Sequence, residues 1–364
     1  MRVVEVPLGN RSYKIEVARD LLPDLGRRCQ KLGLGARCAI ITDSKVGPIY
    51  SPKAQDTLKS AGFEPIAIEI PSGEKAKDLK YVQKCYDDLA AHRLERKSFI
   101  VALGGGVVGD LAGFVAATYL RGIPFVQVPT TLLAQVDSSV GGKVGVNLKA
   151  GKNLVGAFYQ PRLVFCDLAT LDSLPEREFK AGLAEVIKYG IIYDPLLFAR
   201  IERDLDKILG REPKVLTEVV ARCCEIKADV VGQDETESGL RAILNFGHTI
   251  GHGLEAISHY GKYLHGEAIS IGQVAAARLS ELQLGFNPND VRRVRELFRR
   301  AGLPVNVRLA PNEKKKLFEA MRLDKKVSAG EIKFVLAPQI GKVEFGQKVP
   351  PENIEKVLKE LETI

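Results

Sequence analysis

The chain contains 364 residues, of which 45% are hydrophobic and 27% charged, a composition typical of a soluble globular protein and not of a disordered one. No hydrophobic run is long enough to cross a bilayer, and the N-terminus lacks a signal-peptide pattern, so we expect a cytoplasmic protein without a membrane partner. The net charge of +8 is spread among carboxylates without a basic, aromatic-rich run, which argues against nucleic acid and favours a small anionic substrate.

The first 170 residues alternate between short hydrophobic runs and amphipathic segments. Strands are predicted at 1–7, 38–42, 65–70, 98–103, 124–128 and 163–166, and helices at 45–61, at 78–92 and from the glycines at 104–109 through Tyr119. Strands that alternate with helices of ten to fifteen residues indicate an α/β domain with a parallel, Rossmann-like sheet.

After about residue 170 helical periodicity dominates. Helices are predicted at 175–191, 195–209, 213–232, 248–258, 265–284 and 289–301, then a hairpin at 331–336 and 342–345, and a last helix at 351–362. The length exceeds what one hydrophobic core usually serves. We therefore expect a nucleotide-binding α/β domain over 1–170 and a mostly α-helical domain over 171–364, with the active site between them.

The six cysteines are scattered and form no C-x-x-C pair. Scattered thiols in a chain of this size indicate a reducing compartment. We expect all six to be small hydrophobic core residues.

A glycine-rich turn, Gly104-Gly-Gly-Val-Val-Gly109, lies between a predicted strand and a predicted helix. In that context G-x-G-x-x-G favours a nucleotide site over a turn without a ligand, because backbone N–H groups at the helix N-terminus can bind a pyrophosphate. The usual acid is missing after the next strand, which ends at Thr130 and Thr131. Asp43 ends an earlier strand and is the alternative, and Asp110 is expected to open the helix. The loop at 72–77 is either a second anion-binding loop or a surface turn.

Four of the five histidines lie between His248 and His265, and His248 and His252 are four residues apart on one predicted helical face. A catalytic divalent metal takes about three protein ligands. Glu185, inside a hydrophobic helix, is a possible third ligand, although it could instead form an ion pair with Lys188. The spacing favours metal binding by Glu185 over the ion pair but excludes neither interpretation.

Glycine-flanked cations suggest a phosphate or carboxylate site. Lys143 lies in one predicted glycine-rich loop, and Lys152 and Asn153 lie in a second. Arg121 and Arg241 taken singly are more typical of surface charges.

Together these motifs resemble the 3-dehydroquinate synthases, sugar-phosphate cyclases of the shikimate pathway, over nearly the whole chain. The matching segments are Ser72-Gly-Glu-Lys75, Gly104-Gly-Gly-Val-Val-Gly-Asp110, Pro129-Thr-Thr131, Gly141-Gly-Lys143, Gly151-Lys-Asn153, Ala184-Glu-Val-Ile-Lys-Tyr-Gly190, Asn245-Phe-Gly-His248, Gly251-His252 and Leu264-His-Gly-Glu267.

The resemblance implies conversion of 3-deoxy-D-arabino-heptulosonate 7-phosphate to 3-dehydroquinate and phosphate, a carbon–oxygen lyase reaction. NAD would oxidise the C5 hydroxyl, phosphate would be eliminated, the hydride would return, and an intramolecular aldol reaction would close the ring. The implied cofactors are NAD and zinc or cobalt, the implied partner is the sugar-phosphate substrate, and the implied assembly is a homodimer.

The resemblance also implies residue roles. Glu185, His248 and His265 would be the metal ligands, and His259 would not. The catalytic and substrate-binding set would be Arg121, Lys143, Lys152, Asn153, Lys188, Lys227, Arg241, Asn245 and His252, with a lysine from Lys325 or Lys326. The NAD contacts would be Asp43, Ser72, Gly73, Glu74, Lys75, Ala76, Lys77, Gly106, Val107, Val108, Gly109, Asp110, Thr130, Thr131, Lys143, Lys152, Thr170, Leu171, Asp172 and Ser173.

Three alternative functions stay open at this stage. The first is another sugar-phosphate cyclase, from secondary metabolism, with the same fold and metal. The second is a polyol or glycerol-phosphate dehydrogenase on a related scaffold, which would release NADH continuously. The third is a non-catalytic nucleotide-binding protein, and an intact metal triad argues against it.

Overall fold

The structure is a computed structural model that describes residues 1–258, 262–323 and 332–363. The chain forms two compact units: Met1–Leu174 with Leu216–Thr236, and Pro175–Val215 with Glu237–Ile364. After residue 215 the chain returns to the first unit, because most of helix α7 (Pro213–Gln233) belongs to that unit. The expected single boundary at residue 170 did not include this return. Arg2 explains part of this return, since its guanidinium forms ion pairs with Glu218 and Glu225 of α7 at 2.7 and 2.8 Å.

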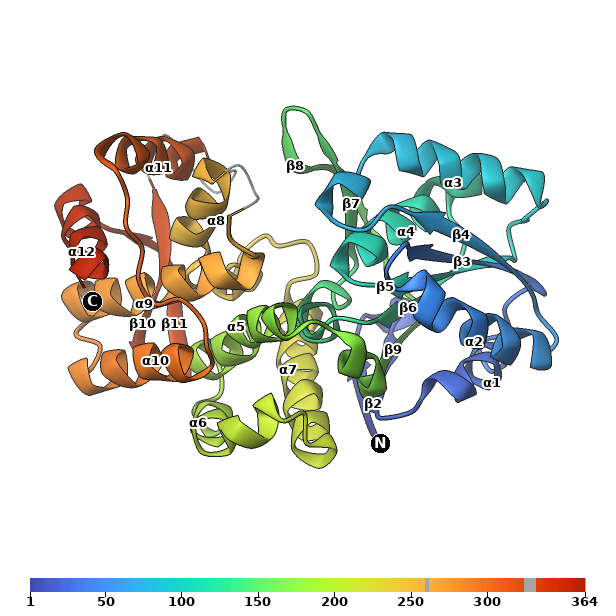
Figure 1. Cartoon of the computed structure of the whole chain (residues 1–364), viewed down its shortest axis with the longest axis horizontal. Helices are drawn as coiled ribbons and strands as arrows, with labels where there is room; N and C mark the ends of the chain where they lie inside the picture. The colour runs from blue at the N-terminus through green and yellow to red at the C-terminus, as the bar shows by residue number, and fades with distance from the viewer. Residues whose placement is uncertain (259–261, 324–331, 364) are drawn as a thin grey trace. The chain divides into compact units, whose positions relative to one another are not determined.

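The first unit is built on a seven-stranded sheet of order β1-β2-β9-β6-β5-β3-β4 (Figure 1). The strands from β2 to β4 in this order are parallel, as predicted, while β1 and β2 are antiparallel. Strand β2 follows a short turn that the hydrophobic pattern did not reveal. The strands are β1 (Arg2–Val6), β2 (Tyr13–Ala18), β3 (Arg37–Asp43), β4 (Glu64–Ile70), β5 (Phe99–Gly104), β6 (Phe125–Pro129) and β9 (Leu163–Asp167).

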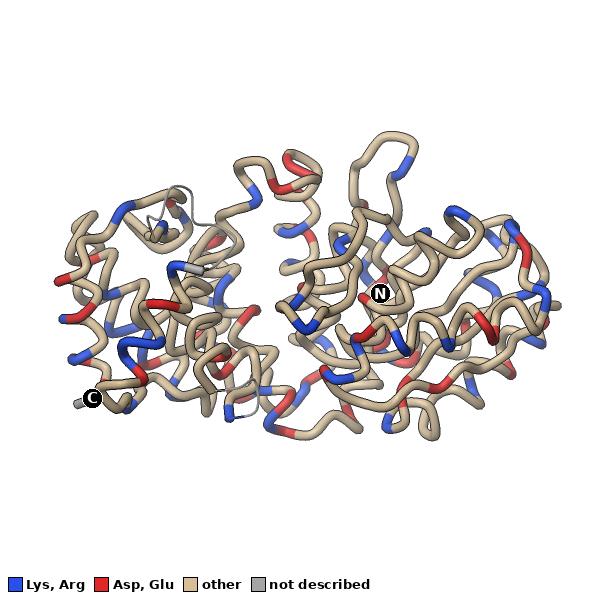
Figure 2. Tube along the Cα trace, turned by 90° about the horizontal axis from the view of Figure 1, so that it is seen from above, with Lys and Arg blue, Asp and Glu red and all other residues tan. Residues whose placement is uncertain are grey.

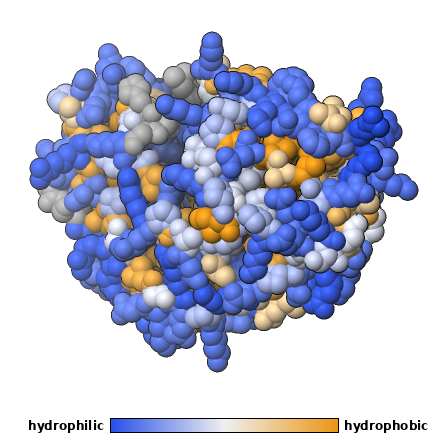
Figure 3. All heavy atoms as spheres, turned by 45° about the vertical axis from the view of Figure 1, so that its right-hand side comes forward, coloured by the Kyte–Doolittle hydropathy of each residue, from blue (hydrophilic) through white to orange (hydrophobic). Residues whose placement is uncertain are grey.

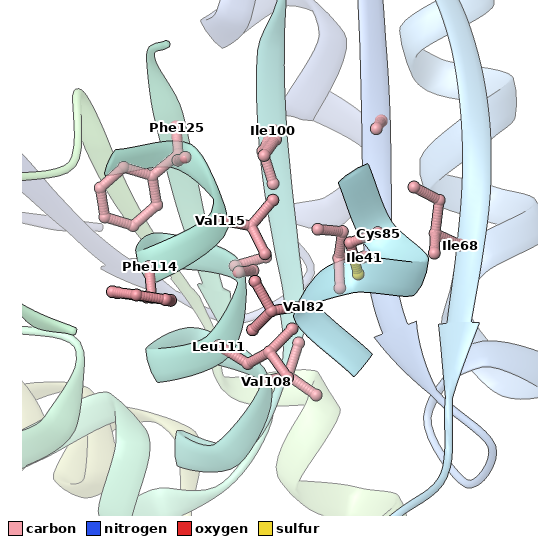
Figure 4. Close-up of a cluster of buried hydrophobic side chains, with 14 of the residues drawn as sticks. Ile41, Ile68, Val82, Cys85, Ile100, Val108, Leu111, Phe114, Val115 and Phe125 are labelled. Carbon is pink, nitrogen blue, oxygen red and sulfur yellow. The ribbon is translucent and has the colours of Figure 1, made fainter. Parts of the chain in front are cut away.

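Helices cover this sheet and bury its side chains in two clusters. They are α1 (Leu25–Gln30), α2 (Gly47–Ser60), α3 (Leu79–Ala91) and α4 (Gly106–Thr118). Figure 4 shows one cluster, in which side chains of α3 and α4 meet those of the strands; the residues labelled are Ile41, Ile68, Val82, Cys85, Ile100, Val108, Leu111, Phe114, Val115 and Phe125. Because the core is continuous on this face, the ends of the strands are fixed relative to α4.

The predicted glycine-rich loops around Lys143 and Lys152 are instead an antiparallel hairpin, β7 (Lys143–Leu148) and β8 (Gly151–Phe158), visible in Figure 1. The glycines suggested loops, but two of them serve close packing within strands. Gly145 pairs with Gly156 across the hairpin. A Cβ atom at Gly145 would lie 2.5 Å from the backbone oxygen of Val155, so no larger side chain fits there without a shift of the strand.

The second unit is mostly helical, as predicted. Its helices are α5 (Glu176–Ile192), α6 (Pro195–Leu209), α8 (His248–Ile257), α9 (His265–Leu284), α10 (Pro288–Arg300), α11 (Pro311–Leu323) and α12 (Pro351–Thr363). The predicted late hairpin is present as β10 (Lys333–Gln339) and β11 (Lys342–Lys348). Basic and acidic residues are interspersed along the trace of both units (Figure 2), in agreement with the spread of lysine and arginine among carboxylates in the sequence.

On the face drawn in Figure 3, hydrophobic residues form separate patches among hydrophilic ones. None of the helices in the described part of the chain is both long and hydrophobic enough to span a membrane. All six cysteines are free and buried, as expected, and burial raises the pKa of the Cys29 and Cys85 thiols to about 12.

Candidate functional site

Three side chains from three helices of the second unit converge as a candidate metal centre. Glu185 lies in the middle of α5, and His248 and His265 are the first residues of α8 and α9. The Nε2 atoms of His248 and His265 lie 3.6 and 3.7 Å from Glu185 Oε1. One ligand atom from each residue lies within 4.8 Å of the others, so a single divalent ion could contact all three.

Two glycines allow the helices to approach closely enough for this convergence. A Cβ atom at Gly266, next to His265, would lie only 1.8 Å from the backbone oxygen of Ala181 on α5. A Cβ atom at Gly272 of α9 would lie 2.0 Å from the backbone oxygen of Gly247, which precedes His248. Glycine at both positions removes the side chain that would push α9 away from its neighbours, so these residues set the spacing between the ligands.

The surroundings of Glu185 fit a metal ion. Its side chain is fully buried, and neither carboxylate oxygen accepts a hydrogen bond from the described residues. Lys188, one turn later on α5, forms an ion pair with Oε2, while Oε1 faces the histidines. This geometry is compatible with both interpretations of the sequence, because Lys188 pairs with one carboxylate oxygen while the other faces the two histidines.

The two histidines are held by their other ring nitrogens. His248 Nδ1 lies 3.1 Å from the backbone oxygen of Phe246, and His265 Nδ1 lies 3.2 Å from Glu255 Oε2. Burial lowers the pKa of His265, but the nearby carboxylates of Glu185 and Glu255 outweigh it and raise the pKa to about 10. Without a metal this ring therefore carries a proton that a bound cation would have to displace.

His252 lies beside these ligands. Its ring centre is 5.1 Å from that of His248 and 6.0 Å from that of His265. His252, Glu255 and His265 also form a second group whose ligand atoms lie within 4.8 Å of one another. A basic group so close to the candidate metal could exchange protons with a bound substrate.

The candidate nucleotide turn lies in the first unit, where β5 ends at Gly104 and α4 begins at Gly106. Its last glycine has a packing role, because a Cβ atom at Gly109 would lie 2.7 Å from Gln127 Oε1 on β6. Strand β3 pairs with β5, so Asp43 at its end lies at the same edge of the sheet as the turn. Asp43 Oδ1 accepts hydrogen bonds from the backbone N–H groups of Lys45 and Val46 at 2.8 and 3.1 Å, which orients its carboxylate.

The sequence suggested that Asp110 begins α4, but Asp110 lies in the second turn of this helix. Its carboxylate accepts a hydrogen bond from the buried Lys77 at 2.5 Å, and Lys77 donates a second to Asn153 Oδ1 at 2.5 Å. Burial raises the pKa of Asp110, and the ion pair with Lys77 offsets only part of that effect. Lys77 thus joins the 72–77 loop, α4 and β8 into one polar cluster.

The same loop contacts the hairpin at a second point. Glu74 Oε1 accepts a hydrogen bond from Asn147 Nδ2 at 2.8 Å and lies 3.8 Å from Lys152 Nζ. Asn147 Oδ1 in turn accepts a hydrogen bond from the backbone N–H of Asn153 at 2.9 Å. The backbone of Asn153 is left-handed, with a φ of 53°. The predicted anion-binding loop and the two predicted cation loops are therefore one connected structure, although Lys143 lies at the exposed start of β7.

The remaining expected NAD residues are spread over two segments of the same unit. Thr130 is buried, and its hydroxyl has no hydrogen-bond partner among the described residues, whereas Thr131 Oγ1 accepts the N–H of Ala134 at 3.1 Å. Residues 170–173 form the 3-10 helix η6 (Leu168–Ser173), where the Tyr50 hydroxyl lies 2.7 Å from Ser173 Oγ. Asp172 is not a free carboxylate, because Arg19 Nη1 donates to its Oδ1 at 3.2 Å.

The residues expected in catalysis and substrate binding are divided between the units. Arg121, Lys143, Lys152, Asn153 and Lys227 lie in the first, and Lys188, Arg241, Asn245 and His252 in the second. Lys227 and Arg241 are buried at 5% and 2% exposure, so neither is the ordinary surface charge that Arg241 alone suggested. Lys325, Lys326 and His259 lie outside the described residues.

Two family models match adjoining parts of the chain: 3-dehydroquinate synthase N-terminal matches residues 67–181, and 3-dehydroquinate synthase C-terminal matches residues 182–327. The 3-dehydroquinate synthase of Desulforamulus reducens is 49% identical to this chain over 98% of this chain and 99% of its own length. The chain belongs to the 3-dehydroquinate synthase family. It is an NAD- and metal-dependent lyase of this family, which excludes the dehydrogenase and non-catalytic alternatives.

Solved structures of other sugar-phosphate cyclases share the fold of this chain. A 2-deoxy-scyllo-inosose synthase complexed with carbaglucose-6-phosphate, NAD+ and Co2+ has a TM-score of 0.89 and 28% identity, covering 99% of this chain and 100% of its own. The 2-epi-5-epi-valiolone synthase of Streptomyces hygroscopicus, with NAD+ and Zn2+ bound, has a TM-score of 0.86 and 27% identity, covering 96% of both chains. Both are much less similar in sequence than the dehydroquinate synthase from D. reducens.

Three acidic residues contact side chains that are expected to bind the substrate or the metal. The sequence did not single out these three acids. Lys227 Nζ lies 2.7 Å from Asp137 Oδ1 in the short π-helix η5 (Ala134–Ser138) and 2.6 Å from the Asp137 backbone oxygen. Asn245 Nδ2 donates to Glu237 at 3.4 Å, and Glu255 contacts His265. No local pattern singles these acids out, since each is identified only by the residue it contacts in space.

Proposed function

We propose that this chain converts 3-deoxy-D-arabino-heptulosonate 7-phosphate to 3-dehydroquinate and phosphate, with NAD held by the first unit and a divalent metal held by Glu185, His248 and His265. The observation that carries the proposal is the buried, incompletely satisfied carboxylate of Glu185, which faces two imidazole nitrogens at 3.6 and 3.7 Å. A three-residue N,N,O set suits a catalytic zinc or cobalt ion that keeps a position open for substrate.

The cofactors would supply the chemistry that side chains lack. Bound NAD supplies a reversible hydride acceptor, and a bound zinc or cobalt ion supplies a Lewis acid that makes a substrate hydroxyl more acidic. Lys188 pairs with Oε2 of Glu185 and leaves Oε1, the oxygen that faces the histidines, unoccupied by its ammonium group. His252, beside both histidine ligands, is placed to hold or accept a proton from the substrate.

The nucleotide would be held by the turn from Gly106 to Asp110 and the loop at 72–77. Free backbone N–H groups at the start of α4 suit a pyrophosphate. Asp43, at the neighbouring strand end, would take the ribose in place of the acid missing after β6. The Asp110 carboxylate would not repel the phosphates strongly, because Lys77 pairs with it.

The substrate is a sugar with two anionic groups, a phosphate and a carboxylate, and both require cations. Lys143, Lys152, Lys227, Arg121 and Arg241 would supply them, and Asn153 and Asn245 would bind hydroxyls. The buried pairing of Lys227 with Asp137 fixes the ammonium group before substrate binds. A clamp of fixed charges also holds the flexible product of phosphate elimination in the conformation that the aldol step needs.

We also propose a cytoplasmic homodimer. The family resemblance supports the assembly, and the hairpin carries exposed hydrophobic side chains at Leu154 and Phe158 that a second subunit could cover. The free cysteines support a reducing compartment.

One assay tests the activity. The purified chain is given the heptulosonate phosphate, NAD and zinc, and inorganic phosphate and NADH absorbance are followed together. We expect phosphate release to match substrate consumed, with no net NADH and with 3-dehydroquinate as product. Sustained NADH without phosphate would contradict the cyclase assignment. Turnover of another sugar phosphate in preference to this substrate would instead support a cyclase of secondary metabolism.

A further inference from the structure

We propose that Glu255 is a positioning residue for the metal ligand His265: it fixes which imidazole nitrogen carries the proton, and so keeps Nε2 available to the metal. This inference rests on the metal site proposed above. It concerns a residue outside the three ligands and outside the expected substrate clamp.

The contact between the two residues fixes the state of the ring. Glu255 Oε2 lies 3.2 Å from His265 Nδ1, and the Glu255 side chain is only 10% exposed. A carboxylate can only accept a hydrogen bond, so Nδ1 must be the donor. In the neutral ring that binds a metal, the lone pair then lies on Nε2, which is the nitrogen 3.7 Å from Glu185 Oε1.

His248 shows the same arrangement with a different partner. Its Nδ1 faces the backbone oxygen of Phe246 at 3.1 Å, and its Nε2 faces Glu185 Oε1 at 3.6 Å. A backbone carbonyl holds one ligand, and a side chain holds the other. The His265 side chain is 30% exposed and that of His248 is 11% exposed, so packing holds His265 less firmly and its orientation depends more on the hydrogen bond.

The position of Glu255 in the fold explains how it reaches the ring. It lies in the last turn of α8, three residues after His252, so both side chains occupy one face of that helix. His265 begins α9, which packs on α8. Burial of a carboxylate is costly unless it is paired, and its hydrogen bond to His265 provides that pairing. Orienting partners of this kind typically change metal affinity by about 10–100-fold.

Glu255 could instead be a metal ligand itself, because His252, Glu255 and His265 also present ligand atoms within 4.8 Å of one another. That alternative would place His265 in a different ligand set, in which its Nδ1 side faces the ion. The first set is favoured because His265 Nδ1 already points at the carboxylate, as His248 Nδ1 points at a carbonyl. The coordination of bound cobalt distinguishes the two.

The test compares four full-length variants: Glu255→Ala, Glu255→Gln, Glu185→Ala and a control, Glu281→Gln. Glu281 also pairs with a cation, Arg278, but lies at the far end of α9 from His265. Affinities for zinc and cobalt are measured by chelator competition at fixed pH, and the visible spectrum of the cobalt-loaded protein is recorded. Circular dichroism confirms that each variant is folded.

For Glu255→Ala we expect metal affinity about 10–100-fold weaker, with one ion still bound per chain and the cobalt bands at their wild-type positions. Glu255→Gln should fall between wild type and Glu255→Ala, since an amide oxygen accepts the hydrogen bond but carries no charge. Glu281→Gln should bind like wild type. If Glu255→Ala does not fold, the Gln variant decides: a loss of about threefold or more supports the inference, and wild-type affinity overturns it.

Three results would overturn the inference. Wild-type affinity in Glu255→Ala, together with metal loss in Glu185→Ala, would remove Glu255 from the site while leaving the site intact. Altered cobalt bands in Glu255→Ala would make Glu255 a ligand and not a positioning residue. Unchanged metal content in Glu185→Ala would overturn the proposed metal site itself, and the role of Glu255 with it.

Discussion

Lys188 and Glu185 form an ion pair one turn apart on α5, with side-chain exposures of only 1% and 0%. The ammonium group contacts Oε2, and Oε1 faces the Nε2 atoms of His248 and His265. A buried carboxylate between one fixed cation and two imidazoles is stable without a metal and ready to bind one. The pair therefore links the stability of the second unit to its chemistry.

Removing either partner of this pair should separate stability from metal binding. Glu185→Ala leaves a buried ammonium group unpaired, and we expect the free energy of unfolding to fall by about 3–5 kcal/mol. The double variant Glu185→Ala/Lys188→Met removes both charges and should recover most of that loss. Neither variant should bind zinc. Urea unfolding and metal analysis measure both effects, and stoichiometric zinc in either variant would contradict the proposed ligand set.

Gly266→Ala should disrupt the convergence of the ligands without changing any of them. The added Cβ would lie 1.8 Å from the backbone oxygen of Ala181, so α9 must move away from α5, and His265 moves with it. We expect the free energy of unfolding to fall by about 1–3 kcal/mol or more, as for other overpacked sites, and metal affinity to fall as well. Gly285→Ala, at the end of the same helix, meets no atom within 4 Å but has a φ of 69°. As a control it should cost stability and leave metal affinity unchanged.

Lys227→Met should impair catalysis far more than it impairs folding. Its ammonium group is held by Asp137 at 2.7 Å, and removing it leaves an uncompensated carboxylate where an anionic substrate is expected. Losing one partner of a buried charge pair at a binding site typically costs about 2–5 kcal/mol, so kcat/KM should fall by roughly 30-fold or more. Steady-state phosphate release measures the effect. Lys84→Met, which breaks the exposed pair with Asp88 in the same unit, should leave kcat/KM unchanged.

Asp110→Asn should change how stability depends on pH. Burial raises the pKa of the Asp110 carboxyl, and Lys77 only partly offsets this. The folded protein therefore holds this proton more tightly than the unfolded chain. The stability that the proton contributes is complete below the unfolded pKa of about 3.9 and is lost as pH rises through the higher folded pKa.

Asp110→Asn has no carboxyl proton to lose at this position. Its free energy of unfolding should therefore decline less than that of wild type as pH rises from about 4 towards neutral pH. Urea unfolding of the NAD-free protein at several pH values measures the difference. Asp88→Asn, at a partly exposed position, is the control. Parallel pH profiles for wild type and Asp110→Asn would show that this carboxyl does not titrate differently in the folded state.

Periodicity placed most of the strands and helices within a residue or two, because the parallel strands are buried on both faces and the helices alternate regularly with them. The hydrophobic pattern failed where glycines, which are typical of loops, lie within strands instead. In the β7–β8 hairpin, Gly145 and Gly156 pair across the strands, whereas in the sequence they resemble loop residues. Periodicity also could not show that residues 216–236 return to the first unit, because that depends on the partners of Arg2 and Lys227.

The sequence by itself determined the family, the fold class and the three candidate metal ligands, because long motifs in a fixed order identify a fold and its chemistry even without contacts. It could not decide whether Glu185 pairs with Lys188 or faces a metal, since both depend on which oxygen points where. Only the tertiary structure showed that Lys188 contacts one carboxylate oxygen while the other faces the two histidines. It also revealed Asp137 and Glu255, whose importance comes from a neighbour distant in sequence or on another helix and not from any pattern around them.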